Sequence, residues 1–383
     1  MYRVSVSALK PGMRIGRSVV DVTGRILLTA GTVLKPSYIQ YLKQRGIPAV
    51  YVINELAPDV SLPEVVSPET RTRLAAELNR AVAELREVMA TRGTASLRSW
   101  ANAQLSRVRE AVAGVVDEIL RQPQAVFHLQ EIRTHDDYTL QHSVDVCILS
   151  VLIGVSLGYD ERQLRDLGLG AVLHDIGKVT IPEAILKKPG PLTAEERAEI
   201  QKHTTRGFEI LMHCGEFSFH VAHVAYQHHE RWCGGGYPRG LKGPEIHELA
   251  RVVAVADVYD AMTSDRVYRP GYPPERALRN MLEVVPDWFD PRVLAALVEN
   301  VAIYPVGTLV ELNTGETAVV TGVVKGQAAR PRVRVLRDPA GRPVREPWEV
   351  DLAADPTYWI VRTFAEVPPA LAPELQEAVG MMD

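Results

Sequence analysis

The stretch His174-Asp175-Ile176-Gly177-Lys178 is the most informative part of this chain. It ends an apolar segment that we expect to be helical, and an adjacent imidazole and carboxylate are costly to bury there unless another group pairs with them. A histidine followed directly by an aspartate can offer a neutral imidazole to one metal ion and a carboxylate that spans two. Two metal ions roughly 3.5–4 Å apart suit in-line displacement at phosphorus. The stretch therefore predicts a metal-dependent phosphohydrolase.

Further residues of metal-binding type are concentrated in the same third of the chain. All 11 histidines of the 383 residues fall between His128 and His247. The candidate ligands outside the opening stretch are His142, His203, His228, His229 and Asp257. Taken alone, a histidine in the middle of a helix such as His142 is more often a core or surface residue than a ligand. Asp257, in contrast, is the one acid in a Val/Ala-rich run, and a metal is an adequate partner for it.

The adjacent pair His228-His229 raises a geometric question. Consecutive helical residues point about 100° apart, so both imidazoles reach one ion only if the helix ends there. The glycines 234–236 a few residues later favour such an end. Gly177 is expected to permit a sharp turn after His174-Asp175, and Lys178 brings a cation within a turn of the site.

Histidine and carboxylate ligands without thiolates favour iron or manganese, with zinc also suitable, over copper(I) or an iron–sulfur cluster. Cys233 lies four residues after His229. Because no nearby cation pattern would lower its pKa, we favour an inert thiol, or one that lies behind the metal ligands, over a nucleophile.

The overall composition excludes several other classes of protein. The 43 basic and 47 acidic residues give a net charge of −4, which does not favour binding to a nucleic-acid polymer. The longest apolar runs stop well short of the ~18 residues that cross a bilayer, and the N-terminus has no signal-peptide pattern. Three cysteines without a CxxC pair favour a reduced, cytoplasmic location over export.

The pattern of elements predicts a mainly α protein in five parts. These are a small N-terminal α+β module (1–57), a linker with amphipathic helices (58–125), a helical domain with every candidate ligand (126–303), a small β module (304–364) and a C-terminal tail (365–383). In the first part we expect a hairpin with its turn at residues 21–25. In the third we expect helices at 138–157, 161–176, 193–213, 217–231, 246–264, 274–284 and 290–301.

Two apolar stripes run through the helices expected at 68–120. Leu74, Leu78 and Leu85 recur at helical spacing in the first, and Leu105, Val112 and Ile119 are among those in the second. Two interpretations remain open: the stripes pack against the following domain, or they form the seam of a homodimer.

The motifs together resemble the HD-GYP family of the HD phosphohydrolase superfamily. The matching residues are the opening stretch, 188–193, His203, His228-His229-Glu230, Gly236-Tyr237-Pro238 and 256–264. The resemblance covers about 175 residues and includes both motifs that name the family. It implies a helical catalytic domain and, in active members, a bacterial phosphodiesterase that linearises cyclic di-GMP to pGpG, often followed by a cut to GMP. The flanking modules also look like those of some relatives.

Carried over residue by residue, the resemblance implies a first metal ion held by His142, His174, Asp175 and Asp257. It implies a second held by Asp175, His203, His228 and His229, so that Asp175 bridges the two. Lys178 would contact the scissile phosphate, Tyr237 would line the substrate groove, and Arg266 and Arg269 would bind the dinucleotide. Arginine suits this role because its planar guanidinium meets phosphate bidentately.

Two positions depart from the family pattern. Members with a third metal carry a glutamate four residues before the histidine that matches His142, and this chain has Tyr138 there. A neutral phenol is a poor ligand, so two divalent ions are expected. Cys233 replaces an aspartate that is common in the loop, which we expect to alter the loop without abolishing activity.

Three functional hypotheses follow. The first is hydrolysis of cyclic di-GMP, with Asp175 and Lys178 as catalytic residues and a hydroxide that bridges the metals as nucleophile. The second is a catalytically idle cyclic di-GMP receptor, against which the complete ligand set argues. The third is a phosphodiesterase for another cyclic dinucleotide.

Overall fold

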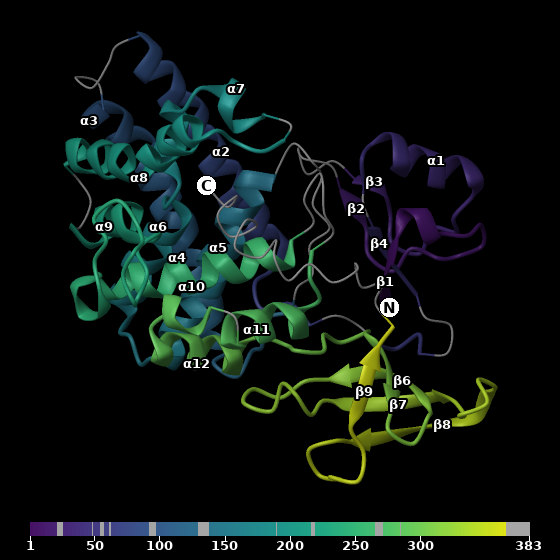
Figure 1. The fold of residues 1–383 in the computed structure, drawn as a ribbon. Helices are drawn as coiled ribbons and strands as arrows, with labels where there is room; N and C mark the ends of the chain where they lie inside the picture. Colours follow the sequence, from purple (N-terminus) through teal and green to yellow (C-terminus); the bar gives the residue numbers. More distant parts are fainter. Residues whose placement is uncertain are drawn as a thin grey trace.

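The computed structural model describes residues 1–20, 26–47, 49–53, 57–60, 63–91, 97–128, 138–188, 190–215, 219–264, 271–283 and 285–364. Figure 1 shows a large helical body, a small N-terminal module beside it and a twisted sheet below that module. The mainly α fold with flanking α+β and β modules is as predicted. Arg266, Arg269, the expected hairpin turn at 21–25 and the tail 365–383 lie outside the described residues. In the described part, no helix has both the length and the apolar character that a membrane span requires.

The N-terminal module contains two short antiparallel pairs and one helix. Strand β1 (Tyr2–Ser5) leads through the short helix η1 (Val6–Ala8) and pairs with β4 (Ala49–Val52), while β2 (Val19–Val20) pairs with β3 (Ile26–Leu28). Helix α1 (Pro36–Gln44) begins at a proline, which is favourable in the first turn because its missing N–H has no partner there. Ile39 and Leu42 of α1 are buried in the module's core.

The linker helices belong to the core of the helical body. They are α2 (Pro68–Thr91), α3 (Leu97–Trp100), the π-helix η3 (Ala101–Leu105) and α4 (Ser106–Arg121). Leu74, Leu85, Val112 and Ile119 are almost completely buried in the same cluster as residues of the ligand-bearing helices. The stripes are therefore used within one chain, which is the first of the two interpretations. A homodimer through these helices stays a prediction and would need other residues.

The ligand-bearing domain is built from helices at nearly the predicted positions. They are α5 (Tyr138–Ser156), α6 (Glu161–Val172), η5 (Ile176–Thr180), α7 (Glu183–Leu186), α8 (Ala194–Cys214), α9 (Phe219–Gln227), η6 (Gly243–Glu245), α10 (Glu248–Thr263), α11 (Pro274–Glu283), η7 (Pro286–Trp288) and α12 (Pro291–Asn300). Two predicted ends are wrong, since α6 stops four residues before 176 and α9 four before 231. Capping boxes at Asp160 and Thr193 fix the starts of α6 and α8.

Helices α5, α6, α9 and α10 pack together, and α8 packs against α9 and η5 (Figure 1). Helix α5 is buried on most sides, with Val144, Ile148 and Leu152 almost fully buried, which places it at the centre of the body. The chain enters and leaves the domain side by side: Phe127 N–H donates to Asn300 O at 2.7 Å, and Ala302 N–H donates to Phe127 O at 2.9 Å.

The C-terminal module is a five-stranded antiparallel sheet in the order β8-β7-β6-β5-β9. The strands are β5 (Leu309–Leu312), β6 (Thr317–Gly322), β7 (Arg332–Arg337), β8 (Pro343–Asp351) and β9 (Ile360–Thr363). Alternate residues such as Val310, Val333 and Val335 fill its core, as period-two patterning predicts. The sheet also contacts the linker, where Arg334 forms a bidentate ion pair with Asp59 at 2.6 and 2.9 Å.

Candidate metal centre

The His174-Asp175 pair lies where α6 ends. The chain leaves the helix at Leu173 and continues into η5, so both side chains project from a turn at the centre of the domain. Gly177 is required there for a different reason from the one predicted. Its φ is not among the positive values found for other glycines. A Cβ atom at Gly177 would instead collide with the backbone of His203 on α8, so glycine allows α8 to approach the turn closely.

Asp175 lies between a lysine and three imidazoles. Its Oδ2 atom is 2.8 Å from Lys178 Nζ and 3.3 Å from His174 Nε2, and its Oδ1 atom is 3.4 Å from His203 Nε2 and 3.9 Å from His228 Nε2. Burial alone would raise the pKa of Asp175, but the charge of Lys178 is the largest of the effects that hold this pKa well below its usual value. A carboxylate with its two oxygens facing different groups of donors can bridge two cations.

Three histidines are held in the tautomer that binds metals through Nε2. The Nδ1 atom of His174 is 2.7 Å from Ala171 O, that of His203 is 2.8 Å from Ile200 O, and that of His228 is 3.1 Å from Val224 O and from Ala225 O. A carbonyl only accepts, so Nδ1 carries the hydrogen in each ring. The lone pair of each neutral ring is then on Nε2, which faces Asp175.

In this tautomer the Nε2 lone pairs face one another without a hydrogen between them, an arrangement that a cation would stabilise. The Nε2 atoms of His203 and His228 face each other at 3.4 Å, so two lone pairs meet there. In the described part of the chain, Asp175 Oδ1 has no hydrogen-bond partner. Lone pairs and a carboxylate oxygen that converge in a buried space are the donor set a divalent ion requires, so the residues fit a metal ion.

The pKa values of the histidines agree with this fit. Burial lowers the pKa of His203 to about 4 and that of His228 to about 3, and it also lowers the pKa of His229. These side chains are therefore neutral near pH 7, which is the form that coordinates metals.

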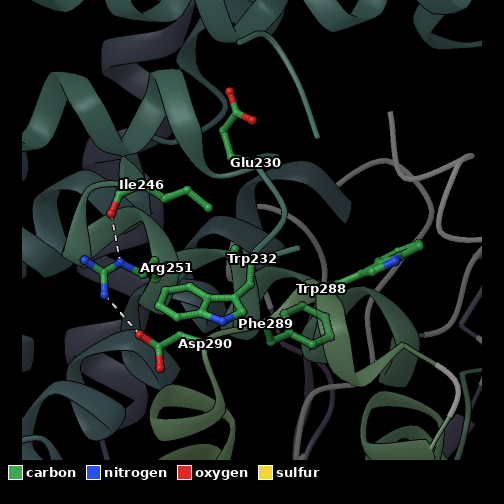
Figure 2. Close-up of a pocket in the computed structure, with 8 residues that line it drawn as sticks. Glu230, Trp232, Ile246, Arg251, Trp288, Phe289 and Asp290 are labelled. Atoms are coloured by element: carbon green, nitrogen blue, oxygen red, sulfur yellow. Dashed lines mark hydrogen bonds and ion pairs between the residues drawn. The ribbon is translucent and has the colours of Figure 1, made fainter. Parts of the chain in front are cut away.

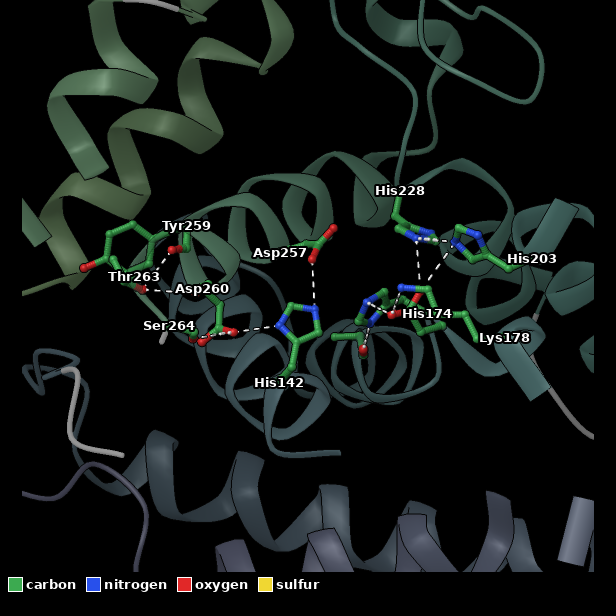
Figure 3. A network of polar contacts seen from close by, with 12 residues as sticks. His142, His174, Lys178, His203, His228, Asp257, Tyr259, Asp260, Thr263 and Ser264 are labelled. Carbon is green, nitrogen blue, oxygen red and sulfur yellow. Dashed lines mark hydrogen bonds and ion pairs between the residues drawn. The ribbon is translucent and has the colours of Figure 1, made fainter. Parts of the chain in front are cut away.

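His142 joins the centre from α5, together with two acids of α10 (Figure 3). Its Nε2 atom is 2.9 Å from Asp257 Oδ1, and its Nδ1 atom is 2.6 Å from Asp260 Oδ2. Asp260 is fully buried, and our sequence analysis did not select it. Its signal was present: a second acid follows Asp257 by three residues, on the same face of a helix that is largely apolar around these two positions.

The structure brings together all seven predicted ligands. Their donor atoms form three groups within 4.8 Å: Asp175-His203-His228-His229, His142-His174-Asp175, and His174-His228-Asp257. The first group is identical to the predicted second set. The predicted first set is divided between the other two groups, which share His174. The adjacent pair enters one site because α9 ends at Gln227, one residue before His228.

Tyr237 lies beside the centre, in the loop that follows His229. Its ring stacks on the His229 ring with centroids 4.7 Å apart and an interplanar angle of 28°, and its backbone N–H donates to His229 O at 3.2 Å. Cys233 is exposed earlier in the same loop, and its Sγ atom lies 3.4 Å from Gly234 O. Among the described residues, Cys233 belongs to none of the ligand groups.

Comparisons with known proteins place this geometry in a family. Residues 126–293 match the model of the HD domain, and residues 309–367 match that of a KOW domain associated with the HD domain. A cyclic di-GMP phosphodiesterase of Pseudomonas aeruginosa, PA4108, is 43% identical over 229 residues, which are 58% of this chain and 54% of that protein. Residues 126–293 form an HD domain of the HD-GYP type.

Two further relatives are similar to shorter parts of the HD-GYP chain. A cyclic di-GMP phosphodiesterase of Thermotoga maritima is 42% identical over 165 residues, 43% of this chain and 45% of that protein. The 3'3'-cGAMP-specific phosphodiesterase 3 of Vibrio cholerae is 37% identical over 168 residues, 44% of this chain and 36% of that protein. The HD-GYP chain thus spans about half the length, or less, of these relatives.

Proposed function

We propose that this HD-GYP protein is a metal-dependent phosphodiesterase that hydrolyses cyclic di-GMP. The observation that carries the proposal is the convergence of seven ligand-type side chains, Asp175 among them, with three histidines fixed to present Nε2. Relatives named as cyclic di-GMP phosphodiesterases, at 42–43% identity, support this substrate. The donor set supports two divalent ions, with iron or manganese favoured and zinc suitable.

Ions held by these residues would activate water for attack on phosphorus and offset the negative charge that develops there. The chain's own residues supply the rest. Asp175 orients its two oxygens toward different donor groups, and the carbonyls on Nδ1 keep the imidazoles aligned. Lys178 Nζ stays beside Asp175 on a side chain that is 23% exposed, so it can also reach a substrate phosphate and stabilise charge on its oxygens.

The proposal also assigns substrate binding to three residues, which are Tyr237, Arg266 and Arg269. The stacked position of Tyr237 on His229 places an aromatic ring next to the metal centre, where it can contact a base. The two arginines are assigned by resemblance to the family, as residues that engage the dinucleotide.

The main alternatives are an idle receptor and a phosphodiesterase for another cyclic dinucleotide. The second has specific support, because a relative named for 3'3'-cGAMP is 37% identical over 168 residues. Complete ligand groups argue against the receptor, since a site without catalytic use has no need to retain all seven ligands.

One experiment separates these functions. Anaerobically purified protein, with its metals quantified, is incubated with cyclic di-GMP or 3'3'-cGAMP, and the products are resolved by chromatography. We expect faster loss of cyclic di-GMP and appearance of pGpG, followed or not by GMP. Asp175→Ala serves as the inactive control. Faster loss of 3'3'-cGAMP would show that it, and not cyclic di-GMP, is the preferred substrate. Binding of a cyclic dinucleotide without turnover by metal-loaded protein would support the receptor hypothesis.

A further inference from the structure

Glu230, the residue directly after the two adjacent histidines, is a buried carboxylate that contacts the backbone of the following loop. It is 3% exposed. Its Oε1 atom accepts from the backbone N–H of Arg239 at 2.7 Å, and its Oε2 atom accepts from that of Leu241 at 2.9 Å. These two amides lie just beyond Gly236-Tyr237-Pro238, so a single side chain connects the start of the loop to its end.

The other limb of the loop is held against η7. The N–H of Trp232 donates to Trp288 O and that of Cys233 donates to Asp287 O, both at 2.9 Å. Arg231 also lies over the Trp288 ring at 3.6 Å, close enough for a cation–π contact. Figure 2 shows Glu230, Trp232 and Trp288 around the small pocket that they line. Both limbs are therefore fixed to the body of the domain.

The space inside the loop is also restricted. A Cβ atom at Gly236 would lie 2.5 Å from Arg231 N and 2.6 Å from His229 O, so the chain folds back tightly on the His229 segment at this point. Tyr237 follows directly, and its ring and N–H both contact His229. The position of the Tyr237 ring is thus coupled to the backbone that Glu230 holds.

We propose that Glu230 is a positioning residue for the substrate site. Its two charge-assisted hydrogen bonds close the loop 231–242 and hold the Tyr237 ring against His229, where the ring meets a base of the cyclic dinucleotide. Glu230 belongs to none of the metal-ligand groups among the described residues, so it acts through the loop and not through the ions. The substrate named in this inference rests on the proposed function, whereas the effect of Glu230 on the loop does not.

The test compares Glu230→Gln with a matched control, Glu245→Gln. In Glu230→Gln, the new side-chain amide would turn a donor toward one of the two backbone N–H groups, so at least one bond is lost. Glu245 also accepts from a backbone N–H at the end of the loop, that of Lys242 at 2.9 Å, but it is exposed. For Glu230→Gln we expect KM for cyclic di-GMP to rise about tenfold or more, as loss of hydrogen bonds to a charged group implies. Metal content and the turnover of bis(p-nitrophenyl) phosphate, a small generic phosphodiester, should stay unchanged.

Hydrogen exchange measured by mass spectrometry provides a readout that does not depend on activity. Peptides that contain Arg239 and Leu241 should exchange faster in Glu230→Gln than in the wild type or in Glu245→Gln. If Glu230→Gln does not fold, Glu230→Asp, which cannot reach both amides, replaces it.

The outcomes separate the inference from the proposed function. Unchanged exchange with unchanged KM would overturn the positioning role, and so would a loss of metal in parallel with the rise in KM. If the wild type hydrolyses no cyclic dinucleotide, the proposed function fails, while the exchange experiment still decides whether Glu230 holds the loop.

Discussion

The Nδ1 atom of His142 lies 2.6 Å from the Oδ2 atom of Asp260, although 118 residues separate them in the sequence. Because a carboxylate accepts, Asp260 keeps the hydrogen of His142 on Nδ1 and leaves Nε2 to face the metal centre. A carboxylate behind a metal-binding histidine fixes the ring and increases its basicity. Asp260 is therefore expected to support metal binding without touching the ion.

Asp260→Asn should weaken metal binding while the domain remains folded. The amide can still occupy the space but lacks the negative charge, so His142 is held less firmly in the required tautomer. We expect affinity for the ion near His142 to fall by about 10–100-fold, measured by competition with a chelator. Ser264→Ala, which removes a 3.3 Å hydrogen bond to the same carboxylate but leaves its charge in place, should lower this affinity much less. Equal losses in the two variants would contradict the role of the Asp260 charge.

Asp175→Ala should abolish turnover and reduce the content of both ions, because each loses the same anionic ligand. Lys178→Ala is the informative comparison, since it removes the cation beside Asp175 Oδ2 but no ligand. We expect Lys178→Ala to retain its metals and lose turnover. Metal analysis and steady-state kinetics on the two variants give the answer, and retention of both ions by Asp175→Ala would exclude a bridging role.

Much of this site could be predicted because its chemistry depends on residue types that the sequence shows directly. Acids such as Asp257 in apolar helices require partners, and helical periodicity places most helices within a few residues. The end of α6 was misplaced because periodicity continues through Leu173, whereas the backbone changes to η5 where α8 packs on Gly177. The sequence shows Asp260 as a second acid near Asp257, but it does not show its partner, because His142 lies on distant α5.

Arg266→Ala should weaken substrate binding or turnover and leave metal content unchanged. The assignment rests on resemblance to the family, with a solvated basic residue as the alternative. Loss of a charge-assisted phosphate contact implies about 1.5–3 kcal/mol, seen in kcat/KM for cyclic di-GMP. Arg279→Ala, which removes an exposed arginine paired with Glu275 on α11, is the control and should have wild-type kinetics. A fall in metal content in Arg266→Ala would mean that the arginine supports the fold instead.

The flanking modules should be dispensable for metal binding only if the linker helices are kept. No predicted ligand precedes His142 or follows Asp257, which alone would favour the minimal chain 126–303. However, Leu74, Leu85 and Val112 are buried in the core that α5 and α6 share, so that chain would expose a large apolar surface and aggregate. A chain of residues 63–303 should stay soluble and bind metal. Gel filtration with metal analysis of the two shortened chains tests this expectation. A soluble, metal-loaded chain of residues 126–303 would show that α2 and α4 are not needed for folding or metal binding.

The buried ion pair between Arg71 and Asp145 should couple linker helix α2 to α5. Its atoms are 2.6 Å apart, with side chains 10% and 2% exposed, and Asp145 lies one helical turn beyond His142. Arg71→Met leaves a buried carboxylate without the guanidinium that faces it, which typically costs about 3–5 kcal/mol. The double variant Arg71→Met/Asp145→Asn removes both charges and should recover much of this loss. Urea unfolding of metal-free protein measures the cycle. Strictly additive losses would mean that the two charges do not interact, whereas recovery of stability in the double variant would show that the pair couples α2 to α5.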